Sequence, residues 1–171
     1  MSRIELTRGD VAFGNFRRKY VPVASTVIAT FVPILPIVVS TLWIPHFSFL
    51  VLIAWRLLRP EMWTAAVALP FGLLDDIVAG HPIGQSMAIW TATFLLLDLI
   101  DSRAIYRDYG MDWLIASFLI LGYSFATWTV GQIMGSEMRL LALWPQVLLS
   151  VFSYPLVARL VVALDRWRLS R

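Results

Sequence analysis

Residues 47–100 read FSFLVLIAWRLLRPEMWTAAVALPFGLLDDIVAGHPIGQSMAIWTATFLLLDLI, and this stretch decides the fold class. It holds three apolar runs, separated only by an Arg-Pro dipeptide with a few polar neighbours and by the short segment GHPIG. Long apolar runs that follow one another through such short connections are typical of consecutive membrane helices. The stretch therefore predicts an all-α membrane protein.

The composition of the whole chain agrees with this prediction. Of 171 residues, 59% are hydrophobic and 15% are charged, and the mean hydropathy is +0.75. Soluble proteins average roughly 45–50% apolar and about 25% charged residues. The chain has no cysteine, which excludes disulfides, thiolate catalysis and zinc–sulfur sites.

Six apolar segments are candidates for membrane spans, since a span needs about 20 residues. They cover residues 22–43, 47–58, 62–79, 83–100, 113–134 and 140–164. The second segment is short and crosses a membrane only if Ile44 is included or if Arg56 extends to the headgroups. A re-entrant or interfacial helix is the alternative for this segment.

The positions of the basic residues predict the orientation of the spans. Thirteen of the 14 Lys and Arg residues fall in or beside alternate connections and the two ends of the chain, and only Arg139 falls on the opposite side. The positive-inside rule then places both termini in the cytoplasm. We expect a basic cytoplasmic N-terminal segment (1–21), a six-helix transmembrane domain (22–164) and a cytoplasmic C-terminal tail (165–171). The connections are too short for a soluble domain, which excludes catalysis by one.

Asp75 and Asp76 lie inside the third predicted span, where an ionisable side chain costs a few kcal/mol. One hypothesis is a proton or cation site formed by the two carboxylates. The alternative, which we favour, is that Asp76 accepts hydrogen bonds from the following turn and fixes the hairpin between spans three and four. Adjacent helix positions differ by about 100°, so one carboxylate should face the bundle interior and the other a headgroup or a neighbouring loop.

Other polar residues give weaker signals. His46 and His81 fall in outer connections where either could approach the aspartates, but their spacing matches no metal motif, so we expect interfacial histidines and no metal. Asp98 and Asp101 are expected to form a solvated cytoplasmic cluster with nearby Arg103 and Arg107. No Ser, His and carboxylate grouping suggests a nucleophile with its base, so we expect neither catalytic residues nor a cofactor. The basic residues do not gather on one soluble face, so no nucleic-acid partner is expected.

The same central stretch resembles the rod shape-determining protein MreD family. In that family, an Arg-Pro pair after a short second span precedes the pattern Gly, three residues, Asp, three residues, Gly, one residue, Pro, one residue, Gly. The residues that match are Arg59, Pro60, Gly72, Asp76, Gly80, Pro82 and Gly84. Asp75 stands where the pattern is usually apolar, so the resemblance gives it no role.

This resemblance implies a non-enzymatic inner-membrane component of the bacterial cell-elongation, or rod, complex, which organises lateral peptidoglycan synthesis. The implied partners are the bitopic protein MreC, the actin-like MreB on the cytoplasmic side, a wall glycosyltransferase and transpeptidase pair, and the lipid bilayer. The seven matching residues are implied to be a structural or partner-interface motif.

The alternative is the substrate-binding subunit of a vitamin-type membrane transporter, because the MreD family resembles such six-helix subunits in fold. Those subunits dock through two alanines spaced by four in span one. Here Ala24 and Ala29 are spaced by five, which argues against transport.

Overall fold

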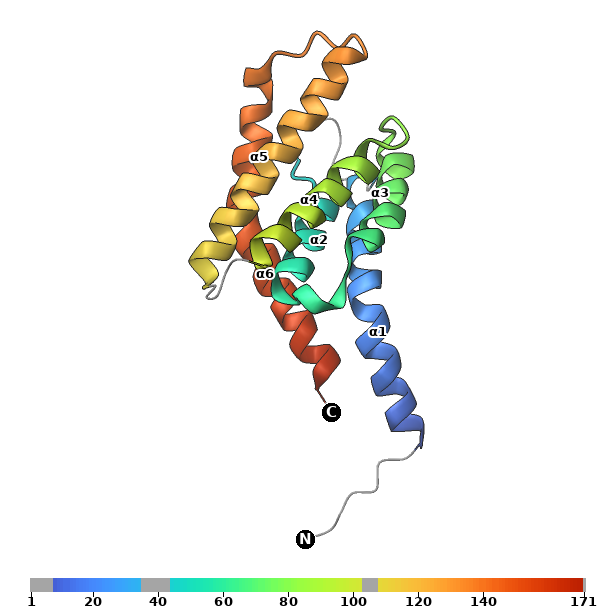
Figure 1. Ribbon diagram of the computed structural model, residues 1–171. Coiled ribbons are helices and arrows are strands. Elements are labelled where there is room, and N and C mark those ends of the chain that lie inside the picture. Colours follow the sequence, from blue (N-terminus) through green and yellow to red (C-terminus); the bar gives the residue numbers. More distant parts are fainter. Residues whose placement is uncertain (1–7, 35–43, 103–107, 171) are drawn as a thin grey trace.

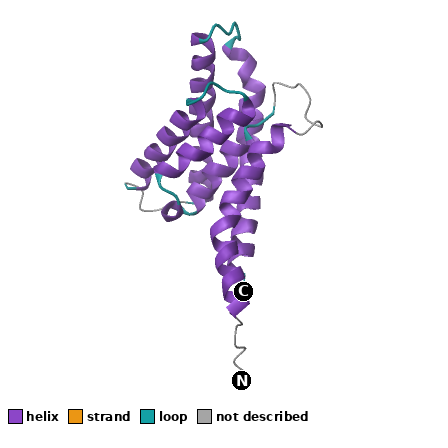
Figure 2. Cartoon of the chain, turned by 90° about the vertical axis from the view of Figure 1, so that its right-hand side faces the viewer, coloured by secondary structure: helices purple, strands orange, loops and turns teal. Residues whose placement is uncertain are grey.

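The computed structural model describes residues 8–34, 44–102 and 108–170, and over these ranges it contains helices and no strand (Figures 1 and 2). The α-helices are α1 (Arg8–Phe31), α2 (Phe47–Leu58), α3 (Ala65–Ala79), α4 (Gln85–Asp101), α5 (Tyr109–Ile133) and α6 (Trp144–Leu169). Short 3₁₀ turns follow α1 (Val32–Ile34), precede α3 (Pro60–Met62) and precede α6 (Leu140–Leu143). The all-helical prediction is confirmed for this part of the chain.

Helix α2 has the bounds that the sequence predicts, and α3 to α6 begin and end within a few residues of the predicted segments. The first helix differs. We predicted a span starting at Pro22, whereas α1 begins at Arg8, runs through Pro22 and ends at Phe31. Proline breaks a helix partly because it leaves a carbonyl unpaired, and here a side chain of α6 satisfies that carbonyl, as described below. Residues 35–43 of the predicted span lie outside the described residues.

Helix α2 lies at the centre of the bundle and packs against α1, α5 and α6. Ten of its 12 residues are buried, and Leu52, Ile53 and Trp55 are fully enclosed. Because protein surrounds α2, lipid does not reach most of its surface. A helix in that position does not need the length of a lipid-facing span.

The buried Arg56 corrects a prediction. Its side chain is 3% exposed and does not extend to a surface; it donates hydrogen bonds to Asp98 and, at 2.9 Å, to Asp101 of α4. Its guanidinium also lies 5.9 Å from the ring centre of Phe94. The two aspartates therefore neutralise a buried cation that the expected cluster did not include, although Asp98 itself stays 48% exposed. The expected partners Arg103 and Arg107 lie outside the described residues.

Helices α3 and α4 form a tight hairpin at Gly72. A Cβ atom placed on Gly72 would lie 2.5 Å from the Cα of Met87 and 2.6 Å from its backbone nitrogen. The two backbones are thus in contact, and only glycine permits this approach.

Two of the described helical segments are long and apolar enough to cross a membrane, namely Tyr109–Ile133 and Leu140–Leu169. Helices α2, α3 and α4 have only 12, 15 and 17 residues. The described part of the fold thus combines one long hairpin, α5 with α6, with the 24-residue α1 and three shorter helices.

The contact at Gly72 predicts the effect of a single methyl group. Gly72→Ala forces α3 and α4 apart and should destabilise the protein by about 1–3 kcal/mol, the range for overpacking. Gly122→Ala in α5 is the matched control, because its Cβ would meet nothing within 4 Å and alanine favours helix over glycine. Thermal unfolding in one detergent should lower the Tm of Gly72→Ala alone; equal Tm values for the two variants would contradict the close approach.

Candidate functional site

The turn between α3 and α4 depends on two glycines with left-handed backbone conformations. Gly80 has φ +70° and ends α3, while Gly84 has φ +99° and precedes α4. The N–H groups of Gly80 and His81 both donate to the carbonyl of Asp76, and the carbonyl of Pro82 accepts from Gln85 N–H at 3.0 Å. Residues with a Cβ are strained in this region of φ, so the turn requires glycine at both positions.

The Asp76 carboxylate binds the other side of this turn. Its Oδ2 accepts from Gly84 N–H at 2.8 Å, its Oδ1 accepts from Ser86 N–H at 2.7 Å, and the side chain is 1% exposed. The first N–H groups of a helix have no partner within it, and its N-terminus favours negative charge. Asp76 thus joins the last turn of α3 to the first turn of α4, as the favoured interpretation of the sequence expects.

The neighbouring Asp75 points into the bundle. Its Oδ1 accepts from Ser48 Oγ of α2 at 2.7 Å, and its Oδ2 accepts from Ser86 Oγ of α4 at 2.9 Å. One carboxylate therefore connects three helices. The sequence prediction that the two aspartates diverge is confirmed, with Asp75 facing the interior and Asp76 facing the turn.

His81 belongs to this group, which we call the turn cluster (Ser48, Asp75, Asp76, His81 and Ser86), and His46 lies beside it. His81 Nδ1 is 3.8 Å from Asp75 Oδ2, and the rings of His46 and His81 are 6.2 Å apart. Burial, with a smaller effect of His81, lowers the pKa of His46 to about 4, so its neutral ring can accept from Gln146 Nε2 at 2.8 Å. Within the described ranges, no three side chains are arranged to hold a metal ion.

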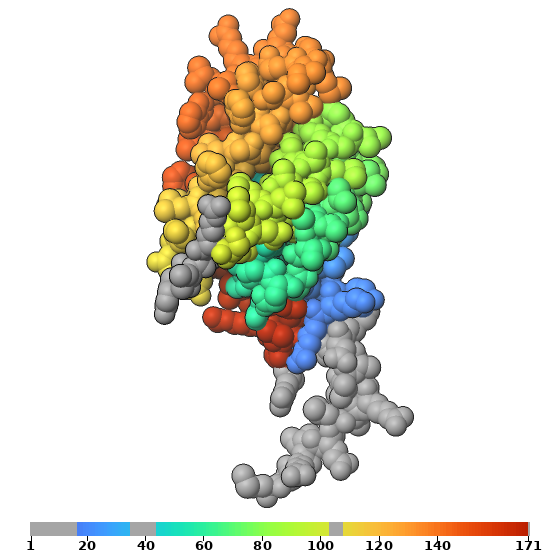
Figure 3. All heavy atoms as spheres, in the orientation of Figure 1, coloured from blue at the N-terminus to red at the C-terminus, as the bar shows by residue number. Residues whose placement is uncertain are grey.

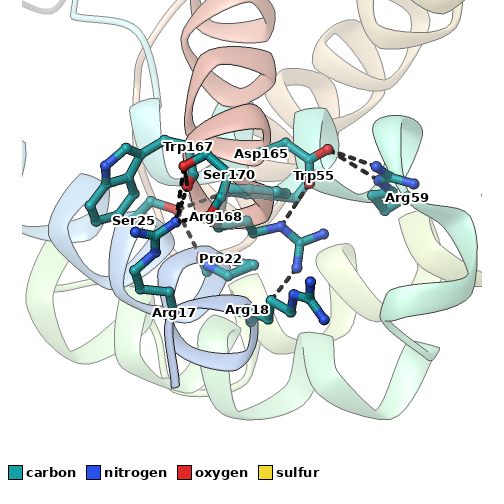
Figure 4. Close-up of polar contacts among 10 residues, drawn as sticks. All are labelled: Arg17, Arg18, Pro22, Ser25, Trp55, Arg59, Asp165, Trp167, Arg168 and Ser170. Carbon is teal, nitrogen blue, oxygen red and sulfur yellow. Dashed lines mark hydrogen bonds and ion pairs between the residues drawn. The ribbon is translucent and has the colours of Figure 1, made fainter. Parts of the chain in front are cut away.

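Arg59 and Pro60 lie at the opposite end of α2 from the turn cluster. Arg59 donates to Asp165 Oδ2 of α6 through Nη2 at 2.8 Å and through Nε at 3.2 Å (Figure 4). The other oxygen of Asp165 accepts from Arg168 Nε at 2.7 Å. We call Arg59, Asp165 and Arg168 the arginine cluster; it fixes the end of α2 to α6.

Arg168 also satisfies the carbonyl that Pro22 leaves free. Proline has no N–H, so the carbonyl of Arg18, four residues earlier in α1, lacks its helical donor. Arg168 Nη1 donates to that carbonyl at 2.7 Å (Figure 4). Its guanidinium lies 5.4 Å from the ring centre of Trp55, a distance typical of cation–π contact. Through Arg168, α6 therefore contacts both α1 and α2.

Arg17 makes a second connection between α1 and α6. Its Nη2 donates to the carbonyls of Trp167 and of Ser170, the latter at 2.6 Å, and its guanidinium lies 4.8 Å from the Trp167 ring centre (Figure 4). A cation near the last carbonyls of a helix is favourable because those carbonyls lack helical donors.

The predicted motif therefore divides into two places. Gly72, Asp76, Gly80, Pro82 and Gly84 lie together in the α3–α4 hairpin, whereas Arg59 and Pro60 lie at the far end of α2. Sequence reasoning did not predict four residues that pair with the polar groups it singled out. Ser48 and Ser86 donate to Asp75, Arg56 donates to Asp98 and Asp101, and Asp165 accepts from Arg59. For Asp165 alone the sequence offered a signal: an acidic residue among the arginines at the end of α6 indicates an ion pair.

A comparison with known families assigns the chain. The family model described as rod shape-determining protein MreD matches residues 16–161, which include both clusters except Asp165 and Arg168. The chain belongs to the MreD family. It is thus a membrane protein of the rod-shape system, as its central stretch indicates. No curated protein and no solved structure matches it.

The hydrogen bonds of Asp76 predict a large effect of its removal. Asp76→Ala leaves two buried N–H groups unpaired and should cost about 1.5–3 kcal/mol for each bond lost to a charged group. Asp108→Ala is the matched control: Asp108 caps α5 through one exposed bond to Met111 N–H, so its loss should cost about 1 kcal/mol. Thermal unfolding of both variants measures the difference, and an Asp76→Ala protein no less stable than Asp108→Ala would refute the assigned role.

Proposed function

We propose that this MreD-family protein is a non-enzymatic inner-membrane component of the rod complex, with six spans and both termini in the cytoplasm. The observation that carries the proposal is that the polar groups of the family motif bind their own chain. Both Asp76 oxygens are occupied by the turn, and Arg59 is occupied by Asp165. A motif used in this way maintains the shape of a bundle, which is what a scaffold requires.

The lipid-facing helices offer surfaces for other membrane proteins. Exposed apolar side chains follow α5 and α6, among them Phe118, Phe125, Phe152 and Leu156. The bitopic protein MreC and the wall glycosyltransferase and transpeptidase pair would bind these exposed helix faces and the outer connections. Contiguous exposed apolar surface of a membrane helix suits helix packing as well as lipid.

The end of the bundle that carries both described chain ends is basic. Arg17, Arg18 and Lys19 of α1 lie there with Arg166 and Arg168 of α6, and Figure 1 shows α1 and α6 extending side by side toward the two termini. We assign the cytoplasmic contact with MreB to this end, in agreement with the positive-inside orientation.

Co-purification tests the proposal. The tagged protein is extracted from native membranes with a gentle detergent, and the proteins recovered with it are identified and quantified by mass spectrometry. We expect MreC and the wall synthases with the wild-type protein and with Asp108→Ala. Asp76→Ala should recover them several-fold less per mole of bait, because the α3–α4 hairpin is no longer fixed.

Two results would contradict the proposal. Recovery of ATPase subunits and a coupling membrane protein would support the vitamin-transporter alternative instead. Full recovery of the rod-complex partners by Asp76→Ala, with normal cell shape, would show that the hairpin geometry is not needed for assembly.

A further inference from the structure

The two sides of the bundle have different apolar lengths. At 1.5 Å per residue, α5 extends about 30 Å from Asp112 to Gln132, which equals the hydrocarbon thickness of a typical bilayer. Helix α3 extends about 24 Å between its capping residues Thr64 and Gly80. Helix α4 extends only about 21 Å from Gly84 to Asp98.

Polar groups fix both ends of the shorter side. At one end, the α3–α4 turn carries an exposed Gly80 and the partly exposed His81. At the other end, the side chain of Asp98 is 48% exposed even though it binds Arg56. An exposed carboxylate is costly in hydrocarbon, so the hydrocarbon beside α4 must end near Asp98.

The face between these ends is apolar and uncovered. Helix α3 exposes Leu69, Leu73 and Ile77, and α4 exposes Leu95 and Leu99 with fractional exposures of 58% and 50%. No other described element of the chain covers these side chains. Figures 1 and 3 show the α5–α6 hairpin rising well above the α3–α4 hairpin, so the difference in length is visible in the shape of the molecule.

We propose that the α3–α4 face locally thins the bilayer, by about 6–9 Å relative to the α5–α6 side. The occupant of this face is lipid. A helix shorter than the hydrocarbon is accommodated by thinning of the bilayer at a modest cost per ångström. Tilt does not help here, because tilting a short helix shortens its span further. The backbone contact at Gly72 also prevents α3 and α4 from sliding along each other to lengthen the face.

The thinning is confined to one side because a short hairpin, α3–α4, and a long hairpin, α5–α6, belong to the same bundle. Arg56 of the central helix holds the polar end of α4, and the α5–α6 hairpin sets the normal thickness on the other side. A step in bilayer thickness therefore follows the boundary between α4 and α5. This inference rests on the six-span topology of the proposed function, but not on the proposed role in the rod complex.

Depth measurements with nitroxide labels test the proposal, and the chain is suited to them because it contains no cysteine. Single substitutions Ile83→Cys and Leu99→Cys label the two ends of the α4 side, and Met111→Cys and Ile133→Cys label the two ends of α5. The labelled proteins are reconstituted into bilayers of 18-carbon phosphatidylcholine. Collision rates with oxygen and with a water-soluble nickel complex then give the depth of each label. If a substitution in α4 prevents folding, Leu69→Cys and Ile77→Cys give the corresponding measurement on α3.

We expect all four end labels at headgroup level, although the α4 pair is about 24 Å apart and the α5 pair about 33 Å apart along their helices. A central label on α4, Thr91→Cys, should then lie several ångströms nearer to water than a central label on α5, Leu121→Cys. Equal depth of the two central labels, with Ile83→Cys or Leu99→Cys inside the hydrocarbon, would overturn the proposal. Exclusion of dissolved oxygen from Leu95→Cys and Leu99→Cys would also overturn it, because protein would then cover the face.

Discussion

Backbone N–H and C=O groups that the helices leave unpaired must find partners inside this bundle, because hydrocarbon offers none. Side chains from distant parts of the sequence supply them. Asp76 accepts from the first N–H groups of α4. Arg168 donates to the Arg18 carbonyl that Pro22 leaves free, and Trp113 Nε1 donates at 3.2 Å to the Val151 carbonyl, four residues before Pro155.

These same contacts hold the helices in place. In these three cases the unpaired backbone group is satisfied by a side chain of another helix or of the opposite arm of a hairpin, so satisfying the backbone also orders the tertiary structure. The central helix α2 depends on this arrangement most, because Arg56 at its end is buried and needs the carboxylates of α4. Removing one partner of such a group exposes the other to an apolar surrounding, which makes the packing cooperative.

Turn chemistry made the hairpin predictable from the sequence. Three glycines, a proline and an aspartate within the 13 residues 72–84 specify a tight helix–turn–helix, and the structure has it at the expected place. The tertiary partners were not predictable in this way. Extension of Arg56 to the headgroups was one of two ways considered for the short span to cross, because its own helix gives no sign of the carboxylates 42 and 45 residues later. The continuation of α1 through Pro22 was not predictable for a similar reason, since the donor for the freed carbonyl comes from Arg168, far along the chain.

In the proposed function, the geometry of the bundle takes the place of catalytic chemistry. The seven motif residues hold a hairpin and a helix end, and the surfaces available to partners or lipid are apolar helix faces and a basic end. Under the proposed thinning, the unequal lengths of α4 and α5 also shape the surrounding bilayer.

Amide hydrogen exchange of the protein in lipid nanodiscs tests the central claim most directly. If Asp76 satisfies the start of α4, the amides of Gly84 and Ser86 should exchange at least about tenfold more slowly than those of Glu137 and Arg139 in the exposed α5–α6 connection, and Asp76→Ala should abolish the difference. Equal exchange in the two connections of the wild-type protein would contradict the account.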